Sequence, residues 1–191
     1  MDDRVVPLLG VTGAFVFAAQ MLNFPVAGGT SGHFLGAALA TILLGPWLAC
    51  LVLAVVLATQ SFVFADGGVS ALGANIVNMG VIGALFAGFA VALGVRVLPP
   101  TRTALLGLVA VVSWTAVMLG AAATSVELAV SGTVPLGTVL PAMLGVHALI
   151  GIGEAAIGVA AVSAVLSTRP DLIAVGRFDA ALEPAPAGAP S

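Results

Sequence analysis

Histidine and amide side chains occur within otherwise apolar stretches of this chain, in positions where they could bind a metal ion. His33 follows a glycine-rich run at 27–32, and Asn75, Asn78 and Met79 occur together early in a later apolar stretch. Polar groups inside a membrane are costly, so they are candidates for a functional site. An imidazole with amide or carboxylate neighbours suits a borderline divalent cation such as Co²⁺ or Ni²⁺. His33 is therefore the candidate metal ligand.

Two further polar residues occur in a late apolar stretch. His147 and Glu154 are seven residues apart, which is two helical turns and places them on one helix face. Two histidines do not define a metal site, and a hydrogen bond to a neighbouring helix accounts equally well for each. Glu154 is expected mainly to hydrogen-bond between helices. With Asn75 and Asn78, these residues are candidates for orienting a metal-bound imidazole, because such imidazoles generally need a partner.

The composition indicates that these groups lie in a membrane protein. Of the 191 residues, 61% are hydrophobic and only 7% are charged, whereas about a quarter of a soluble domain is charged. The net charge is −3 and there is no lysine, so nothing favours binding to nucleic acid through a basic face. We expect an all-α, polytopic transmembrane bundle that spans the lipid bilayer.

The apolar residues fall into about six segments, and each segment ends at glycine, proline or charge. The segments are 5–22, 32–45, 46–65, 73–95, 103–126 and 138–167. A full crossing takes about 20 residues, so the second segment is expected to enter at an angle or from a re-entrant loop. The sixth is expected to include an interfacial turn near Pro141. The predicted domains are a membrane domain at 1–170 and a cytoplasmic, disordered tail at 171–191.

The arginines indicate an orientation. If six spans alternate in direction, all five arginines lie at one face, namely Arg4, Arg96, Arg102, Arg169 and Arg177. The positive-inside rule makes that face, and the C-terminus, cytoplasmic at the cell membrane. An outward-facing pocket is then expected where the polar groups converge, namely His33, Asn75, Asn78, Met79, Glu127, His147 and Glu154.

Small residues recur at every fourth position along the first segment. Gly10, Ala14 and Ala18 lie on one side of this predicted helix, and such spacing lets helix backbones approach closely. Packing within the chain and docking to another membrane subunit both account for the pattern. We favour docking.

Several stretches are specific enough to compare with a known family. They are FVFAAQMLNFPVAGGTSGHFLGAALATILLGPW at 15–47, DGGVSALGANIVNMG at 66–80, HALIGIGEA at 147–155 and RPDL at 169–172. These stretches resemble the CbiM/NikM family, the substrate-binding membrane subunits of energy-coupling-factor transporters for cobalt and nickel. The resemblance extends over essentially the whole chain up to the tail.

The resemblance implies a transport subunit and not an enzyme. Such a subunit works with a transmembrane coupling subunit, two cytoplasmic ATPase subunits and a small accessory membrane subunit. The chain has no Walker A string, so the partners would hydrolyse ATP. His33 matches the family's metal-ligand histidine, and Gly10, Ala14 and Ala18 match the small residues offered to the coupling subunit.

The resemblance also implies the substrate, Co²⁺ or Ni²⁺, with no permanently bound cofactor. Cobalt for cobalamin synthesis is favoured over nickel, because nickel members often carry a long C-terminal extension. Family members begin with Met-His-Ile-Pro and an additional helix, whose amine and histidine complete the ligand set. Here the sequence begins Met1-Asp2-Asp3-Arg4. We therefore expect that helix to be missing, because the start is assigned too late, because the sequence is a fragment, or because this is a short variant that binds metal weakly through His33; the first two are favoured.

Other functions stay open on the residues alone. Ser31, in a G-x-S-G run, and His147 could form the Ser–His pair of an intramembrane serine protease, although rhomboid-type proteases place the serine on a later span. A vitamin-binding subunit of the same transporter type would need an aromatic-lined pocket, and only 6% of the residues are aromatic. A purely structural membrane scaffold is the remaining alternative.

Overall fold

The computed structural model describes residues 5–26 and 30–174 and consists mainly of helices. The predicted tail therefore lies outside the described residues from 175 onward, as do Arg4 and Arg177. The elements in chain order are α1 (Val5–Gln20), β1 (Asn23–Val26), β2 (Thr30–His33), α2 (Ala37–Leu44), α3 (Pro46–Val63), η1 (Val69–Ala71), α4 (Leu72–Asn75), the π-helix η2 (Ile76–Ile82), α5 (Gly83–Val97), α6 (Arg102–Val130), α7 (Leu136–Thr168) and η3 (Pro170–Leu172).

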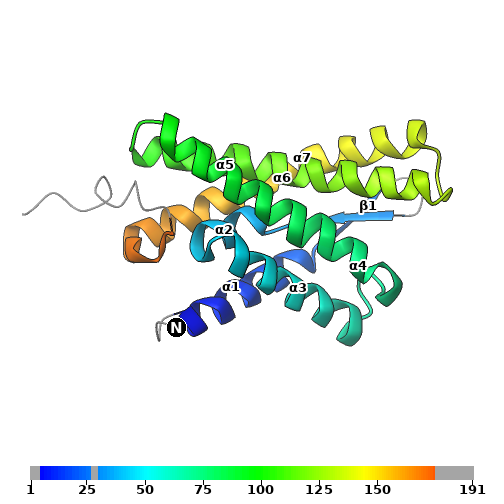
Figure 1. Ribbon diagram of the computed structural model, residues 1–191, viewed down its shortest axis with the longest axis horizontal. Helices are drawn as coiled ribbons and strands as arrows, with labels where there is room; N and C mark the ends of the chain where they lie inside the picture. Colours follow the sequence, from blue (N-terminus) through cyan, green and yellow to red (C-terminus); the bar gives the residue numbers. More distant parts are fainter. Residues whose placement is uncertain (1–4, 27–29, 175–191) are drawn as a thin grey trace, which may run out of the picture.

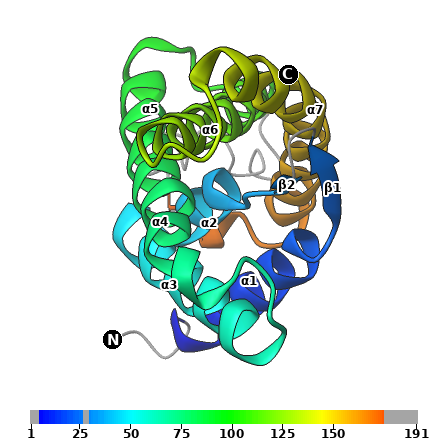
Figure 2. The ribbon, with the colours of Figure 1, turned by 90° about the vertical axis from the view of Figure 1, so that its right-hand side faces the viewer.

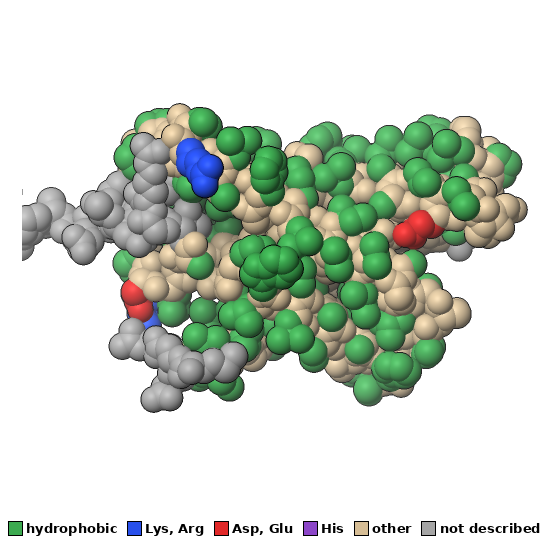
Figure 3. Space-filling view, in the orientation of Figure 1, with side chains coloured by type: hydrophobic (Ala, Val, Ile, Leu, Met, Phe, Trp, Pro, Cys, Tyr) green, Lys and Arg blue, Asp and Glu red, His purple; other side chains and the backbone are tan. Residues whose placement is uncertain are grey.

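The predicted all-α transmembrane bundle is confirmed. Four helical stretches are long and apolar enough to cross a membrane, namely Pro46–Val63, Val69–Val97, Arg102–Val130 and Leu136–Thr168. The first predicted segment is α1, which is apolar but shorter. The second is α2, with only eight residues. Much of the visible surface is apolar along the length of the molecule, and the visible charged side chains lie toward its ends (Figure 3).

The short helix α2 lies at the centre of the bundle. It contacts α1, α3, α5, α6 and α7, and the end-on view shows it surrounded by the longer helices (Figure 2). All of its residues except Leu43 are buried. A helix that is apolar on every side can be covered only in such a position.

A two-stranded hairpin precedes α2 and was not predicted. β1 and β2 pair antiparallel, with Asn23 opposite His33 and Val26 opposite Thr30. The hairpin lies at one end of the bundle, close to the connection between α6 and α7 (Figure 1). His33 is the last residue of this hairpin and lies where the chain turns from β2 into the bundle toward α2.

The described arginines lie at the other end of the bundle. Arg96 is in the last turn of α5, Arg102 begins α6, and Arg169 is the C-cap of α7. These three helix ends lie together on the left of Figure 1, opposite the hairpin. The arrangement is the one expected from alternating spans.

One expectation for the sixth segment differs from the structure. The interfacial turn near Pro141 is wrong, because α7 runs continuously from Leu136 to Thr168 with Pro141 inside it. A proline inside a helix cannot donate to the carbonyl four residues earlier, here that of Gly137, and its ring crowds that carbonyl. At the C-terminal end, the chain packs on the bundle beyond residue 170, since the Ala174 N–H donates to the Ile42 carbonyl at 2.8 Å.

We predict that Gly36→Ala destabilises the fold by about 2–5 kcal/mol. Gly36 has φ +72°, and a Cβ there would lie 2.8 Å from Cγ2 of Val16. Thermal unfolding of the purified protein in detergent micelles measures the effect. The control is Gly107→Ala, because a Cβ at Gly107 meets nothing within 4 Å. If Gly36→Ala and Gly107→Ala both unfold at the same temperature as the wild type, then α1 does not approach Gly36 as closely as described.

Candidate metal-binding site

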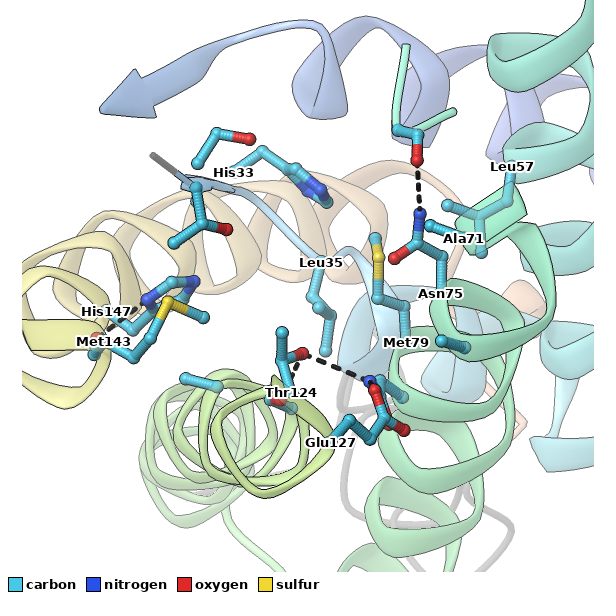
Figure 4. Close-up of a pocket in the computed structure, with 18 of the residues that line it drawn as sticks. His33, Leu35, Leu57, Ala71, Asn75, Met79, Thr124, Glu127, Met143 and His147 are labelled. Atoms are coloured by element: carbon cyan, nitrogen blue, oxygen red, sulfur yellow. Dashed lines mark hydrogen bonds between the residues drawn. The ribbon is translucent and has the colours of Figure 1, made fainter. Parts of the chain in front are cut away.

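A cavity of about 390 Å³ lies at the hairpin end of the bundle. It is lined by residues of β2, α3, α4, η2, α6 and α7 and of the connections between them. Four of the predicted polar residues, His33, Asn75, Asn78 and His147, line it together with Glu127 (Figure 4). The structure therefore brings these five residues and Met79 together at one cavity, whereas the expected convergence is wrong for Glu154, which does not line it.

His33 is the last residue of β2 and is half-buried. Its Nδ1 lies 3.0 Å from the carbonyl oxygen of Phe34. A neutral imidazole that donates Nδ1–H to this carbonyl keeps the lone pair of Nε2 free for a metal. The hairpin and this hydrogen bond together hold the ring at the cavity (Figure 4).

His147 lies against the hairpin from α7. Its Nδ1 is 2.8 Å from the Met143 carbonyl oxygen, one turn earlier in the same helix. A Cβ at Gly32 would lie 2.7 Å from Cε1 of His147 and 2.8 Å from its Nε2. The imidazole therefore packs directly on the backbone of β2, beside His33. This position suits a role in supporting the strand.

Asn78 connects two helices beside the cavity. Its Nδ2 donates to Oγ1 of Thr124 at 3.1 Å and to Oε2 of Glu127 at 2.8 Å. Its Oδ1 is buried and accepts no hydrogen bond from the residues described. A buried oxygen without a partner is rare in folded proteins, so the Asn78 oxygen is available to a polar ligand of the cavity.

Asn75 is held less tightly than Asn78. Within the described part of the chain, its side chain makes one long hydrogen bond, from Nδ2 to the Gly67 carbonyl at 3.4 Å. Gly67 belongs to the connection between α3 and η1, which also lines the cavity. Figure 4 shows Asn75 and Met79 on the same side of the cavity.

The π-helix η2 was missed by the sequence analysis. It comprises Ile76–Ile82 and carries Asn78, Met79 and Gly80, all buried. Inserted π turns are frequent at functional sites. The thiol of Cys50 on α3 donates to the Gly80 carbonyl at 3.3 Å, so the altered backbone has a partner on a neighbouring helix. The apolar pattern of the segment is the same for an α-helix and gave no signal of the change.

Glu154 does not line the cavity, although it belongs to the same helix as His147. Its buried carboxylate accepts hydrogen bonds from the backbone N–H groups of Leu35 at 2.9 Å and Gly36 at 2.6 Å. The expected structural hydrogen bonding is therefore present, and it is directed at the stretch that follows His33.

The cavity is not a ready-made cluster of charged ligands. Within residues 5–26 and 30–174, no three His, Cys, Asp or Glu side chains group closely enough to hold a metal ion. The donors that line the cavity are imidazole, amide, hydroxyl and thioether groups, together with the carboxylates of Asp66 and Glu127. In this described part, no hydrogen bond joins Ser31 to His147.

The small residues of α1 form an exposed face. Gly10, Ala14 and Ala18 are all exposed, and a Cβ at Gly10 would meet no atom within 4 Å. They do not pack inside the described chain, which removes the internal-packing alternative for this face. Their docking role stays a prediction.

Comparison with known proteins identifies the family. Residues 1–172 match the CbiM family model, described as the cobalt uptake substrate-specific transmembrane region. The chain belongs to the CbiM family. The expected resemblance to CbiM/NikM proteins is thereby confirmed, and the chain is a multi-pass membrane protein of a family whose members transport cobalt or nickel.

Individual relatives agree with this assignment. The chain is 34% identical over 200 residues to the fused nickel transport protein NikMN of Rhodobacter capsulatus, covering 96% of this chain and 57% of that protein. A protein of Archaeoglobus fulgidus that also carries the NikMN name is 41% identical over 173 residues, covering 90% of this chain and 57% of the relative. The chain thus spans little more than half the length of these relatives. A crystal structure of a truncated transition metal transporter superposes with a TM-score of 0.80 at 31% identity, covering 87% of this chain and 83% of the other.

We predict that Asn78→Ala lowers the free energy of unfolding by about 1–3 kcal/mol, because it removes hydrogen bonds to two partners on α6. Asn75→Ala is the matched control and is expected to cost less than about 1 kcal/mol, since it removes one long hydrogen bond. Thermal unfolding in the same detergent compares the two variants. If both variants lost the same free energy of unfolding, the conclusion that the Asn78 hydrogen bonds stabilise the contact between η2 and α6 would be wrong.

Proposed function

We propose that this chain is the substrate-capture subunit of an energy-coupling-factor transporter that imports cobalt, with cobalamin synthesis as the pathway served. The observation that carries the proposal is His33, whose imidazole lies at the wall of the cavity with Nδ1 3.0 Å from the Phe34 carbonyl oxygen and with Nε2 in no hydrogen bond to residues 5–26 and 30–174. Family membership supplies the expectation of metal transport. The geometry supplies one residue able to bind the ion.

The donor chemistry of the cavity supports a transition metal. His33, Asn78 and Met79 line it with imidazole, amide oxygen and thioether groups, beside the carboxylates of Asp66 and Glu127. Calcium and magnesium prefer sites built from several oxygen ligands, usually carboxylates. Imidazole-containing sites suit cobalt, nickel and related ions. His33 is proposed as the ligand, and His147 as a residue that keeps the hairpin in place.

Nickel import by the same mechanism is the second candidate. The two relatives compared above bear nickel transport names, whereas the family description is of cobalt uptake. Co²⁺ and Ni²⁺ have similar ligand preferences, so the described cavity does not choose between them. Competition between the two ions for the purified protein makes that choice.

The proposed mechanism needs partner proteins. The transmembrane coupling subunit docks on the α1 face formed by Gly10, Ala14 and Ala18, two ATPase subunits bind on the cytoplasmic side, and a small accessory membrane subunit completes the complex. The arginine-bearing helix ends and the C-terminus face the cytoplasm, by the positive-inside rule. The cavity end then faces outward and captures the ion. Reorientation of the whole subunit, driven by ATP hydrolysis in the partners, releases it inside.

We predict that His33→Ala abolishes cobalt binding and uptake. Co²⁺ at about 100 times its Kd should stabilise the wild type by about 2.7 kcal/mol, and this stabilisation should vanish in the variant. His147→Asn, the control on the same cavity, should weaken binding by roughly 10–100-fold without abolishing it. Uptake of radioactive cobalt by cells carrying the complete transporter gives the second readout. Unchanged uptake with His33→Ala would reject the site.

We also predict that Ala14→Leu blocks uptake while leaving Co²⁺ binding intact, since the added side chain prevents close approach of a partner helix. Ala160→Leu is the matched control, because Ala160 is exposed on α7 and is not part of the α1 face formed by Gly10, Ala14 and Ala18. Co-purification with the coupling subunit reports docking directly. Full assembly and uptake with Ala14→Leu would show that the α1 face is not the docking surface.

A further inference from the structure

The stretch from Phe34 to Gly36 crosses the interior of the bundle without regular secondary structure. It joins β2 to α2, and all three residues are buried. Irregular backbone at membrane depth needs hydrogen-bond partners inside the protein, because lipid supplies none. The partners of this stretch therefore decide whether it holds one conformation.

Side chains from two separate helices supply those partners. From α1, the Gln20 amide donates to the Leu35 carbonyl at 2.8 Å. From α7, the Glu154 carboxylate accepts the Leu35 N–H at 2.9 Å and the Gly36 N–H at 2.6 Å. The backbone N–H and the carbonyl of Leu35 are thus both hydrogen-bonded to side chains, and these side chains come from helices far apart in the sequence.

The two side chains are almost fully buried. Gln20 is 1% exposed and Glu154 is 6% exposed. Burial of a carboxylate is costly unless hydrogen bonds compensate it, and here each oxygen accepts one backbone N–H. Gly36 is also the N-cap of α2, and the positive end of a helix dipole further favours an acidic group at this position. Glu154 is therefore held in one place.

Packing fixes the same stretch from the same two helices. A Cβ at Gly36 would lie 2.8 Å from Val16 on α1. A Cβ at Gly153, which precedes Glu154 on α7, would lie 3.0 Å from the Phe34 ring. The backbone is therefore enclosed on both sides, and any change in the hydrogen bonds of Leu35 must displace its neighbours.

His33 depends directly on this stretch. Its ring hydrogen-bonds to the carbonyl of Phe34 at 3.0 Å, and Leu35 follows immediately. We propose that Gln20 and Glu154 are positioning residues for His33, fixing residues 34–36 so that the imidazole faces the cavity in the orientation that binds the metal. The proposal rests on the proposed role of His33 as the metal ligand. It assigns to two residues outside the cavity a contribution to metal affinity.

The test uses the histidine rings as reporters. The chain has only two histidines, so labelling histidine with ¹⁵N gives two pairs of ring signals, from Nδ1 and Nε2 of each residue, and His33→Asn identifies the pair that belongs to His33. The variants are Gln20→Met and Glu154→Gln, which keep the side-chain volume and remove or halve the hydrogen bonding. Each is measured without metal by NMR and with Co²⁺ alone by calorimetry, alongside thermal unfolding.

Arg102→Gln is the matched control. It removes hydrogen bonds from Arg102 Nη2 to the Ser163 carbonyl at 3.0 Å, Ser163 Oγ at 2.8 Å and Ser167 Oγ at 2.9 Å. These bonds also tie elements to α7, but at the end of the bundle away from the cavity. The control is expected to lower the unfolding temperature and to leave the His33 signal and the Co²⁺ affinity unchanged.

We expect Gln20→Met and Glu154→Gln to shift the His33 signal and to weaken Co²⁺ binding by roughly 10–100-fold, as loss of residues that orient a metal ligand does. If both variants behave like Arg102→Gln, the two residues are purely structural and the inference is wrong, while the proposed function stands. If the wild type binds no Co²⁺, the proposed function fails, and the metal-free His33 signals still decide the positioning role. Gln20→Met leaves the Glu154 contacts in place and decides the question if Glu154→Gln does not fold.

Discussion

The carboxylate of Glu154 meets the backbone N–H groups of Leu35 and Gly36 inside the bundle, and the central part of the structure depends on this contact. Backbone polar groups in a membrane must be satisfied within the protein. A helix does this along its own length, but the stretch before α2 does not. Because Glu154 and Gln20 supply the missing partners, the chain can leave the hairpin, pass through the interior and begin a buried helix.

The path of residues 34–36 through the interior explains why the bundle has both a close-packed centre and a polar cavity. α2 is short and buried on nearly every side, so it fills the centre of the bundle over only part of its length. Toward the hairpin end, the space beside it is the cavity of about 390 Å³. His33 lies where the hairpin ends and the crossing begins. The candidate ligand is thus attached to the most constrained irregular backbone of the described chain.

The sequence predicted those features that depend on local patterns. The six apolar segments, the common end of Arg96, Arg102 and Arg169, and the meeting of His33 with Asn78 all follow from hydropathy, charge and span counting. The hairpin, the π-helix and the partners of Glu154 were not predictable, because they depend on contacts between distant parts of the chain. Glu154 and Leu35, for example, are separated by 119 residues. The metal-binding and docking roles stay predictions.

X-ray absorption at the cobalt edge of the Co²⁺-loaded protein tests the central claim most directly, because it detects imidazole bound to the ion. The account predicts imidazole scattering in the wild type and in His147→Asn, and its loss in His33→Ala. Imidazole scattering that persists in His33→Ala, or disappears in His147→Asn alone, would contradict the claim that His33 is the ligand.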